Sequence, residues 1–529
     1  MKSMGWSGWG LSAWLVAMPA FAATVEVGPG QDVEAAINAA QPGDQIVLLD
    51  GDYTLTERFG IDIAGTEAQP IIIRAADGAQ PHLHRPNANQ NIIDIDGAAW
   101  VEIRGIEFSG GSAGVRISRA DHLTIADCEI HDTGDVALRA NDGGVLYESL
   151  HIVNNHIHHT NDTGEGMYLG CNDNECQVAN SIIERNYVHH TNQPSVDQGD
   201  GIELKEGSYG NIIRDNVIHD TNYPCILTYS AVNNGAANII ERNVMWNCGD
   251  HAIQSAADAT IRNNIILSAG QDGIAMQQHQ SGNPQNLVVV HNTILQSTNN
   301  GISLRNAVGA VTIANNAVYA QGGSAIFIGS GDISMLTLAG NVGQGGVSGG
   351  GGGGYVDGDL MADFVDGHFG GAPPIDVFPA VGGALVGAGD PAHVVDDDFN
   401  TLARDGEADV GAYRFDPEGN PGWTIAEQFK DFPDDGGGAT GGEDSGDGSG
   451  DGETQGTGGG QDDTAGEGSA GEGGGTMGSA GSAGSAGADG GDGDGDGGCG
   501  CRAPGQGPSG GWGGLTVLMV LGAVRRRRM

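Results

Sequence analysis

Residues 199–206 are Gly-Asp-Gly-Ile-Glu-Leu-Lys-Glu, and their alternation decides the fold prediction. Ile202 and Leu204 are apolar, whereas Glu203 and Lys205 are charged. Successive side chains of a strand point to opposite faces, so this pattern predicts a strand whose two apolar residues enter a core. Glu203 and Lys205 are then expected side by side on the outer face, about 6.7 Å apart along the strand.

The same alternation belongs to a repeat in which an asparagine follows an apolar residue by three positions, as in Ile213, Asn216 and Ile218. Successive asparagines are 21 to 31 residues apart, in the range of solenoid repeats. Each unit has two predicted strands and no room for a helix, so we expect an all-β, parallel β-helix with equivalent residues about 4.8 Å apart. A leucine-rich horseshoe is the competing solenoid, but its leucine ladder is absent. We expect these asparagines to take left-handed turn conformations and to hydrogen-bond to one another. They are Asn155, Asn186, Asn216, Asn243, Asn264, Asn292, Asn316 and Asn341.

Both ends of the chain differ from the repeat. Residues 1–22 combine one lysine, an apolar run and a small-x-small pattern ending at Ala22, which is typical of a secretory signal peptide. Residues 31–40 follow a helical period and predict a short helix that caps the first coil. We assign residues 23–414 to the β-helix and residues 415–498 to a disordered Gly/Ser/Asp-rich linker.

The charge of the chain excludes one class of partner. Its 529 residues carry a net charge of −46, and the predicted folded part shares the acidic excess. Nucleic acid is therefore an unsuitable partner, because phosphate binding requires a basic surface.

The cysteines indicate an oxidising compartment, because a signal peptide implies export. Cys171 and Cys176 enclose a short loop and are predicted to form a disulfide, and Cys225 and Cys248 lie in successive repeats and are predicted to bridge them. Cys128 falls in an inward position and is expected to be a buried thiol.

Polar and aromatic residues gather on the predicted outer face of the second strand. One column runs through Tyr168, Glu203 and Gln254, and its neighbour runs through Lys205 and Tyr229. Long loops on one face of a solenoid usually line its binding surface, and the loops that enter these coils are the longest. The predicted substrate-binding residues are Arg139, which we place in the Lys205 column, Tyr168, Gln254, Gln277 and Arg305.

Carboxylates approach the same edge. Glu165, Asp200 and Glu203 are predicted to bind Ca²⁺, which takes several oxygen ligands. The alternative is an ordinary solvated acidic face with a Glu–Lys pair of small energetic value.

A second column, at a fixed offset after the first strand, is rich in histidine. Two stacked histidine pairs could bind a metal, but such residues are more often turn residues that hydrogen-bond between coils, and the pattern favours this second interpretation. Both interpretations stay open for His131-Asp132, His158-His159, His189-His190 and His219-Asp220.

Two segments carry a family resemblance. Residues 31–54 and 70–78 resemble the start of secreted right-handed β-helix proteins, especially polysaccharide lyases of the chondroitinase B and alginate lyase kind. Residues 201–222 are similar to the coil that carries an acidic metal ligand and a catalytic lysine in those lyases and in some pectate lyases. The resemblance implies that Glu203 is a calcium ligand and Lys205 the general base.

The chain also departs from those lyases. They pair the lysine with an arginine one coil later, where this chain has Tyr229. The pectate lyase pattern has several aspartates in the next turn, where this chain has Asp220 alone.

The implied reaction is β-elimination in an acidic polysaccharide. A base removes the proton on carbon 5 of a uronate while a cation stabilises the developing negative charge. Lys205 must be neutral for this, so its pKa has to fall, and Tyr229 is the candidate acid. The alternative is a non-catalytic surface adhesin or glycan-binding scaffold; a β-helix hydrolase is disfavoured because its motifs are absent. We expect a monomer.

The C-terminal segment, residues 499–529, indicates attachment to the cell envelope. Cys499 and Cys501 precede an apolar run at residues 512–524 and an arginine cluster at residues 525–528. This arrangement resembles the sorting tag of exported myxobacterial proteins, which implies processing or modification at the cysteines. The apolar run is short for a spanning helix, which needs about 20 residues, and a plain membrane anchor is the alternative.

Overall fold

The computed structural model describes residues 22–296, 298–351 and 353–431. The signal peptide core, most of the predicted linker and the segment with Cys499 and Cys501 lie outside the described residues.

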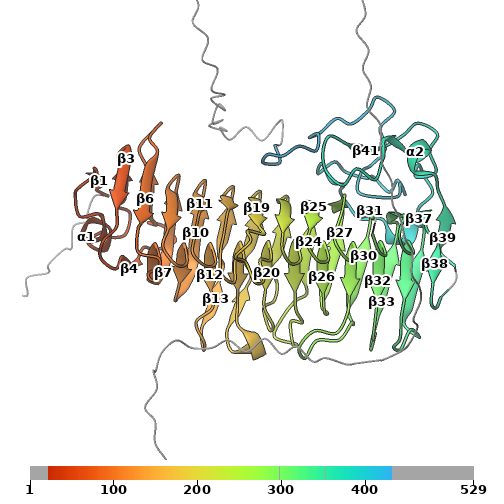
Figure 1. Ribbon diagram of the computed structural model, residues 1–529, viewed down its shortest axis with the longest axis horizontal. Coiled ribbons are helices and arrows are strands. Elements are labelled where there is room, and N and C mark those ends of the chain that lie inside the picture. The colour runs from red at the N-terminus through yellow and green to blue at the C-terminus, as the bar shows by residue number, and fades with distance from the viewer. Residues whose placement is uncertain (1–21, 297, 352, 432–529) are drawn as a thin grey trace, which may run out of the picture. The chain divides into compact units, whose positions relative to one another are not determined.

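The chain forms a parallel β-helix of stacked coils, as Figure 1 shows. Most coils contribute three strands, and the coils β12–β15 (residues 138–158) and β16–β19 (residues 167–191) contribute four. In one three-stranded coil the strands are β20 (Ile202–Leu204), β21 (Ile212–Arg214) and β22 (Val217–Thr221). Each pairs in parallel with its equivalents in the neighbouring coils, so the coils build three faces. The predicted fold is confirmed, but the expected two strands per coil are wrong. The backbone bends sharply just before Asn216, and this bend divides one predicted strand into two.

The three faces are named by the strands of this coil. Face 1 contains β4 (Gly60–Ala64), β9 (Val115–Ile117), β12 (Leu138–Ala140), β16 (Met167–Leu169), β20, β23 (Ile226–Thr228), β26 (Ile253–Ser255), β29 (Ile274–Met276), β32 (Ile302–Leu304), β35 (Ile326–Ile328) and β38 (Val347–Ser348). Face 2 contains β1 (Thr24–Val27), β2 (Gln45–Leu48), β5 (Ile71–Ala75), β10 (Ala120–Ala126), β13 (Leu146–Glu148), β14 (His151–Val153), β17 (Gln177–Ala179), β18 (Ile182–Glu184), β21, β24 (Asn238–Glu241), β27 (Ala259–Arg262), β30 (Leu287–Val290), β33 (Val311–Ala314) and β36 (Leu336–Ala339). Strand β7 (Ile93–Arg104) is long enough to pair in both faces.

Face 3 is a separate sheet. It contains β3 (Gly51–Thr54), β6 (Pro81–Arg85), β8 (Glu107–Gly110), β11 (Glu129–His131), β15 (His156–His158), β19 (Tyr187–Thr191), β22, β25 (Val244–Cys248), β28 (Ile265–Ile266), β31 (Thr293–Gln296), β34 (Ala317–Ala320), β37 (Asn341–Gln344) and β39 (Tyr355–Asp357). The N-terminal end is capped by helix α1 (Val33–Asn38), whose first turn is capped by the Asp32 side chain. This confirms the predicted helix, although it is shorter than residues 31–40.

The interior is a stack of aliphatic side chains, among them the fully buried Ile202, Ile213 and Ile218 of one coil. The corner between faces 2 and 3 adds a polar ladder. Asn216 Nδ2 donates to Asn243 Oδ1 at 2.9 Å, and the backbone N–H of Asn216 donates to the same oxygen at 3.0 Å. The same pair of bonds links each asparagine from Asn155 to Asn341 to the next.

The predicted asparagine ladder is confirmed, with one correction. The left-handed conformation belongs to the residue before each asparagine, as at Asp215, whose φ is 57°. That residue makes the sharp corner, and the buried asparagine then faces inward, where its amide reaches both neighbouring coils.

Replacing Asn216 by alanine is expected to destabilise the protein strongly. The change leaves two donors of Asn186 without their acceptor, and an unsatisfied buried polar group costs about 1–3 kcal/mol. Chemical denaturation should therefore show a lower free energy of unfolding by at least ~2 kcal/mol. Asn89→Ala, at an exposed turn, is the control; an equal loss in both variants would contradict the role of the ladder.

The two predicted disulfides are confirmed. The sulfur atoms are 2.04 Å apart in Cys171–Cys176 and 1.99 Å apart in Cys225–Cys248. Cys128 is the free cysteine of the described residues, and burial raises the pKa of its thiol to about 12.

Beyond β39 the chain turns back over face 3. This return segment, residues 359–431, includes α2 (Leu360–Asp363), β40 (Phe364–Asp366) and β41 (Asp376–Pro379) and lies beside the later strands in Figure 1. Phe399, Tyr413 and Trp423 belong to one buried cluster with Trp246 and Leu295 of face 3. None of the helices in the described ranges is long and apolar enough to span a membrane.

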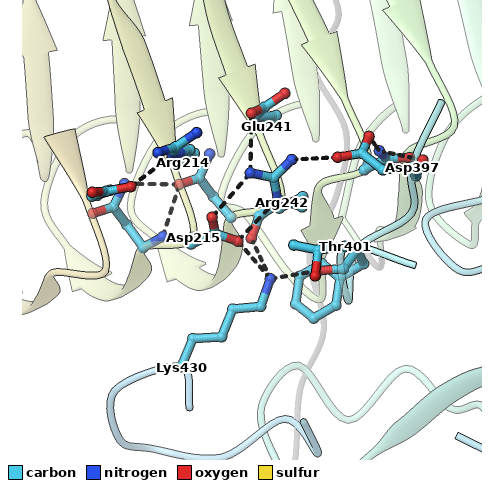
Figure 2. A network of polar contacts seen from close by, with 12 residues as sticks. Arg214, Asp215, Glu241, Arg242, Asp397, Thr401 and Lys430 are labelled. Atoms are coloured by element: carbon cyan, nitrogen blue, oxygen red, sulfur yellow. Dashed lines mark hydrogen bonds and ion pairs between the residues drawn. The ribbon is translucent and has the colours of Figure 1, made fainter. Parts of the chain in front are cut away.

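A buried polar network holds the last part of the return segment (Figure 2). Lys430 Nζ lies 2.9 Å from Asp215 Oδ1 and donates to the carbonyls of Phe399 at 2.7 Å and Arg242 at 3.1 Å. Arg242 contacts Asp215 Oδ2 at 3.2 Å and Asp397 Oδ2 at 2.7 Å. Burial lowers the pKa of Lys430 to about 8, although Asp215 opposes this. The packed chain therefore continues beyond residue 414, where the sequence analysis placed the start of the linker.

Lys430→Met should loosen this segment while keeping the side-chain volume. It removes the ion pair with Asp215 and two hydrogen bonds to carbonyls, so we expect a loss of about 1–3 kcal/mol. Limited proteolysis after residue 414 should become faster, and the melting temperature should fall. Gln428→Met, at an exposed position two residues earlier, should change neither quantity; unchanged proteolysis of Lys430→Met would contradict the clamp.

Candidate functional site

The strand register on face 1 decides which outer side chains are neighbours. Tyr168 of β16 pairs with Glu203 of β20, which pairs with Leu227 of β23, and Leu227 pairs with Gln254. Arg139 of β12 pairs with Tyr168. Arg139 therefore lies in the Glu203 column, and its predicted place in the Lys205 column is wrong.

Lys205 and Glu203 form a closed cluster with Tyr229. Lys205 Nζ lies 2.5 Å from Glu203 Oε1 and donates to Tyr229 Oη at 3.3 Å. Tyr229 Oη donates to Glu203 Oε1 at 3.0 Å, and the lysine also lies 4.5 Å from the centre of the Tyr168 ring. The side chains lean together, so the expected separation of about 6.7 Å describes only their strand positions.

This cluster is covered rather than solvated. Glu203 is 1% exposed and Lys205 is 5% exposed, although both point away from the core. A loop at residues 277–283, which follows β29, contributes the cover. His279 Nε2 lies 3.0 Å from Tyr229 Oη, Ser281 Oγ donates to Glu206 Oε1, and Gln280 Nε2 donates to Asn172 Oδ1 at 3.0 Å.

Sequence reasoning missed His279. The loop has no strand period, so nothing local indicates that it folds onto a strand two coils earlier. Its one signal is the distance from Asn264 to Asn292, which is longer than the preceding interval.

The three carboxylates predicted to bind calcium come together. One oxygen from each of Glu165, Asp200 and Glu203 lies within 4.8 Å of the others, and all three residues are buried. Glu165 and Asp200 precede β16 and β20, which are equivalent strands of successive coils. The two coils are joined at this point by a hydrogen bond from Gly166 N–H to the carbonyl of Asp200. Within the described chain, both oxygens of Glu165, both of Asp200 and Oε2 of Glu203 accept no hydrogen bond.

Buried carboxylates without donors are costly unless a proton or a cation neutralises them. Burial raises the pKa of Glu165 to about 7, with a contribution from the charge of Glu203. Burial, Glu203 and Glu165 raise the pKa of Asp200 well above its ordinary value. Five free carboxylate oxygens in a small volume are what a hard cation such as Ca²⁺ requires, so the donor set fits this ion.

The protonation of Lys205 differs from the expectation. Burial acts to lower the pKa of its amine, but the negative charge of Glu203, followed by Tyr229 and Tyr168, raises it above its ordinary value. Burial and Glu203 also raise the pKa of Tyr229, which keeps its hydroxyl protonated.

The remaining predicted binding residues extend along face 1. Gln277 Nε2 donates to Gln254 Oε1 at 3.2 Å, and Arg305 Nη1 lies 2.8 Å from Asp272 Oδ2. Arg139 Nη1 lies 3.2 Å from Asp135. Asp272, which the sequence analysis did not select, is buried and connects Arg305 to Ser303.

Comparisons with known proteins agree with this architecture. Residues 19–220 match a family described as Pel9A-like, right handed beta helix region, and residues 188–318 match one described as right handed beta helix region. The β-helix is thus right-handed.

Individual relatives are distant. Pectate lyase PEL9 of Emericella nidulans is 24% identical over 320 residues, which cover 54% of this chain and 72% of the relative. The crystal structure of an alginate lyase from Paenibacillus sp. covers 62% of this chain and 99% of its own, with 21% identity and a TM-score of 0.40. The corresponding values for pectate lyase Pel9A are 74%, 96%, 13% and 0.43. The chain is thus similar to a pectate lyase over 54% of its length, and its fold is a right-handed parallel β-helix.

Amine labelling can test the cover over Lys205, because the only lysines of the chain are Lys2, Lys205 and Lys430. Lys205 should react slowly with a small acylating reagent. His279→Ala removes one hydrogen bond of the covering loop, worth about 1 kcal/mol, so labelling should become about fivefold faster. Peptide mass spectrometry measures both rates. Gln278→Ala, exposed in the same loop, should leave them unchanged; no acceleration in His279→Ala would show that the loop does not control access.

Proposed function

We propose that this protein is an exported lyase that cleaves an acidic, uronate-containing polysaccharide by β-elimination at the Lys205 cluster of face 1. The observation that carries the proposal is a set of three buried carboxylates with five oxygens that accept no hydrogen bond, next to a lysine and a tyrosine. The similarity of this chain to a pectate lyase supports an acidic polysaccharide as the substrate class.

Glu165, Asp200 and Glu203 would hold a Ca²⁺ ion, which when bound supplies positive charge for a substrate carboxylate. The other roles belong to side chains of the chain itself. Lys205 Nζ takes the proton from carbon 5 only as the neutral amine, so the charge of Glu203, which raises the pKa of Lys205, must first be neutralised. Tyr229 Oη gives a proton to the leaving oxygen. His279, 3.0 Å from Tyr229 Oη, is placed to return that proton.

Recognition of the polymer falls to the residues along face 1. The chain has a net charge of −46 and repels a polyanion at long range, so positive groups must act locally. Arg139 and Arg305 lie in coils on opposite sides of β20, and Tyr168, Gln254 and Gln277 lie between them. We assign all five residues to substrate binding.

The cellular location of the protein is inferred from the signal peptide pattern and from the C-terminal tag. Residues 1–22, cleaved after Ala22, direct export, and the acidic linker with the tag around Cys499 and Cys501 holds the β-helix at the cell envelope. Both disulfides suit an oxidising compartment outside the cytosol.

A non-catalytic glycan-binding scaffold is the second candidate function. The observation that favours it is the 5% exposure of Lys205 beneath the covering loop. A binding surface needs no access to this amine, whereas a lyase does.

The deciding experiment incubates the purified protein with a panel of uronic-acid polymers, with and without Ca²⁺, and follows the ultraviolet absorbance of the unsaturated product. We expect a calcium-dependent rise with one polymer. Lys205→Ala should lower the rate at least ~100-fold, because general base catalysis contributes about that factor or more. Arg119→Ala, exposed after β9 and three coils before β20, should keep full activity. Full activity of Lys205→Ala would refute the assignment.

Calcium binding has a readout of its own. Ca²⁺ should raise the melting temperature of the wild-type protein and of Asp162→Asn, whose exposed carboxylate lies in the same loop as Glu165. Asp200→Asn should abolish this shift. A flat absorbance trace with every polymer, together with glycan binding, would favour the scaffold.

A further inference from the structure

The outer side of face 3 carries a stack of imidazoles that the proposed reaction does not use. His131, His158, His189 and His219 occupy equivalent positions on successive strands. Their ring centres are 5.0, 5.1 and 5.1 Å apart, with interplanar angles of 16°, 2° and 8°. The strand spacing of a parallel sheet alone accounts for this stacking.

A neighbouring column adds ligand groups beside the stack. Glu129 Oε1 lies 3.4 Å from His156 Nδ1 and 3.0 Å from His158 Nε2. The three ligand atoms all lie within 4.8 Å of one another, and the three side chains are half-buried. Tetrahedral zinc with nitrogen and oxygen bonds of 2.0–2.1 Å separates its ligand atoms by about 3.3 Å, close to the spacing found here.

The second nitrogens of both histidines already have partners. His156 Nε2 lies 2.8 Å from His189 Nε2, and His158 Nδ1 lies 2.7 Å from His159 Nδ1. A carboxylate only accepts, so the hydrogen-bond network assigns the protons of His156 and His158 to the nitrogens that face Glu129. Their outer nitrogens then accept hydrogen bonds from His189 and His159.

A cation beside Glu129 would reverse these tautomers. The two inner nitrogens become lone-pair donors, and the two protons move to the outer nitrogens, which donate them to His189 and His159. Metal-binding histidines usually donate their other N–H to such a partner, which orients the ring. No proton needs to leave the cluster, because every imidazole stays neutral.

We propose that Glu129, His156 and His158 form a binding site for a divalent transition metal, with zinc as the best fit. Two imidazoles and one carboxylate are an established ligand set for zinc, and the half-buried position leaves room for water as a fourth ligand. His159 and His189 are positioning residues. The site lies on face 3, whereas the carboxylates proposed for calcium precede or belong to strands of face 1.

A similar set one coil earlier indicates that the arrangement is not unique to Glu129. Glu107 Oε1 lies 3.5 Å from His82 Nε2 and 3.1 Å from His131 Nε2. His82 Nε2, the nitrogen that faces Glu107, also lies 2.6 Å from Ser109 Oγ, which competes for it. We therefore place the tighter site at Glu129.

The test is a zinc titration of the full-length protein after chelator treatment, by calorimetry or competition with a chromogenic chelator. We expect saturable binding of one tight zinc. Glu129→Gln and His156→Gln should each weaken it by more than the roughly 100-fold that marks the upper range for outer partners. His151→Gln is the control, because His151 pairs with Glu184 on face 2 at 2.8 Å without a second imidazole.

Substitution of His159, whose ring contacts His158, provides a sharper measurement. His159 has a φ of 55°, so His159→Gly removes the imidazole without backbone strain and should weaken zinc binding about 10- to 100-fold. His159→Asp should restore the affinity, because Asp220 contacts His219 Nδ1 from the equivalent position at 2.6 Å. Circular dichroism checks that each variant is folded.

Three results would overturn the proposal. They are the absence of saturable zinc binding, equal affinities of the wild-type protein and both His159 variants, and binding that survives Glu129→Gln but is lost in Glu107→Gln. The last result would move the metal to the neighbouring set.

Discussion

The buried asparagine ladder is the interaction on which the rest of the structure depends. Each side-chain oxygen accepts a backbone N–H and an amide N–H from the coil before it, so the register of one coil fixes that of the next. A slip by one residue would turn every inward isoleucine outward and break this ladder at once. Because all three faces share one register, residues far apart in sequence meet in predictable columns.

The two ligand clusters show what such a frame makes possible. Glu165 and Asp200 are held at equivalent places in successive coils and cannot move apart without disturbing the strands that follow them. Their repulsion is therefore retained in the folded state and favours whatever ion can neutralise it. On face 3 the same spacing brings imidazoles together, but there the half-buried groups satisfy one another through neutral hydrogen bonds.

The sequence allowed the solenoid and much of face 1 to be predicted, because both depend on local periodicity. Asn216 and its equivalents set the repeat, and the three carboxylates could be placed by counting from it. The third strand was missed because the corner at Asp215 interrupts the backbone without interrupting the apolar pattern. His279 and Lys430 were missed for another reason. Each contacts a residue far away in sequence, and no local pattern encodes such a contact.

The position of Lys430 determines how the β-helix would respond to pulling. Lys430, at the end of the described chain, lies beside the coils of Asp215 and Arg242, in the middle of the stack and not at its last coil. Tension on that point would enter through the clamp and spread through the strands on both sides. The inter-coil hydrogen bonds would then share the load as shear, whereas a pull on the terminal coil would peel them away one after another.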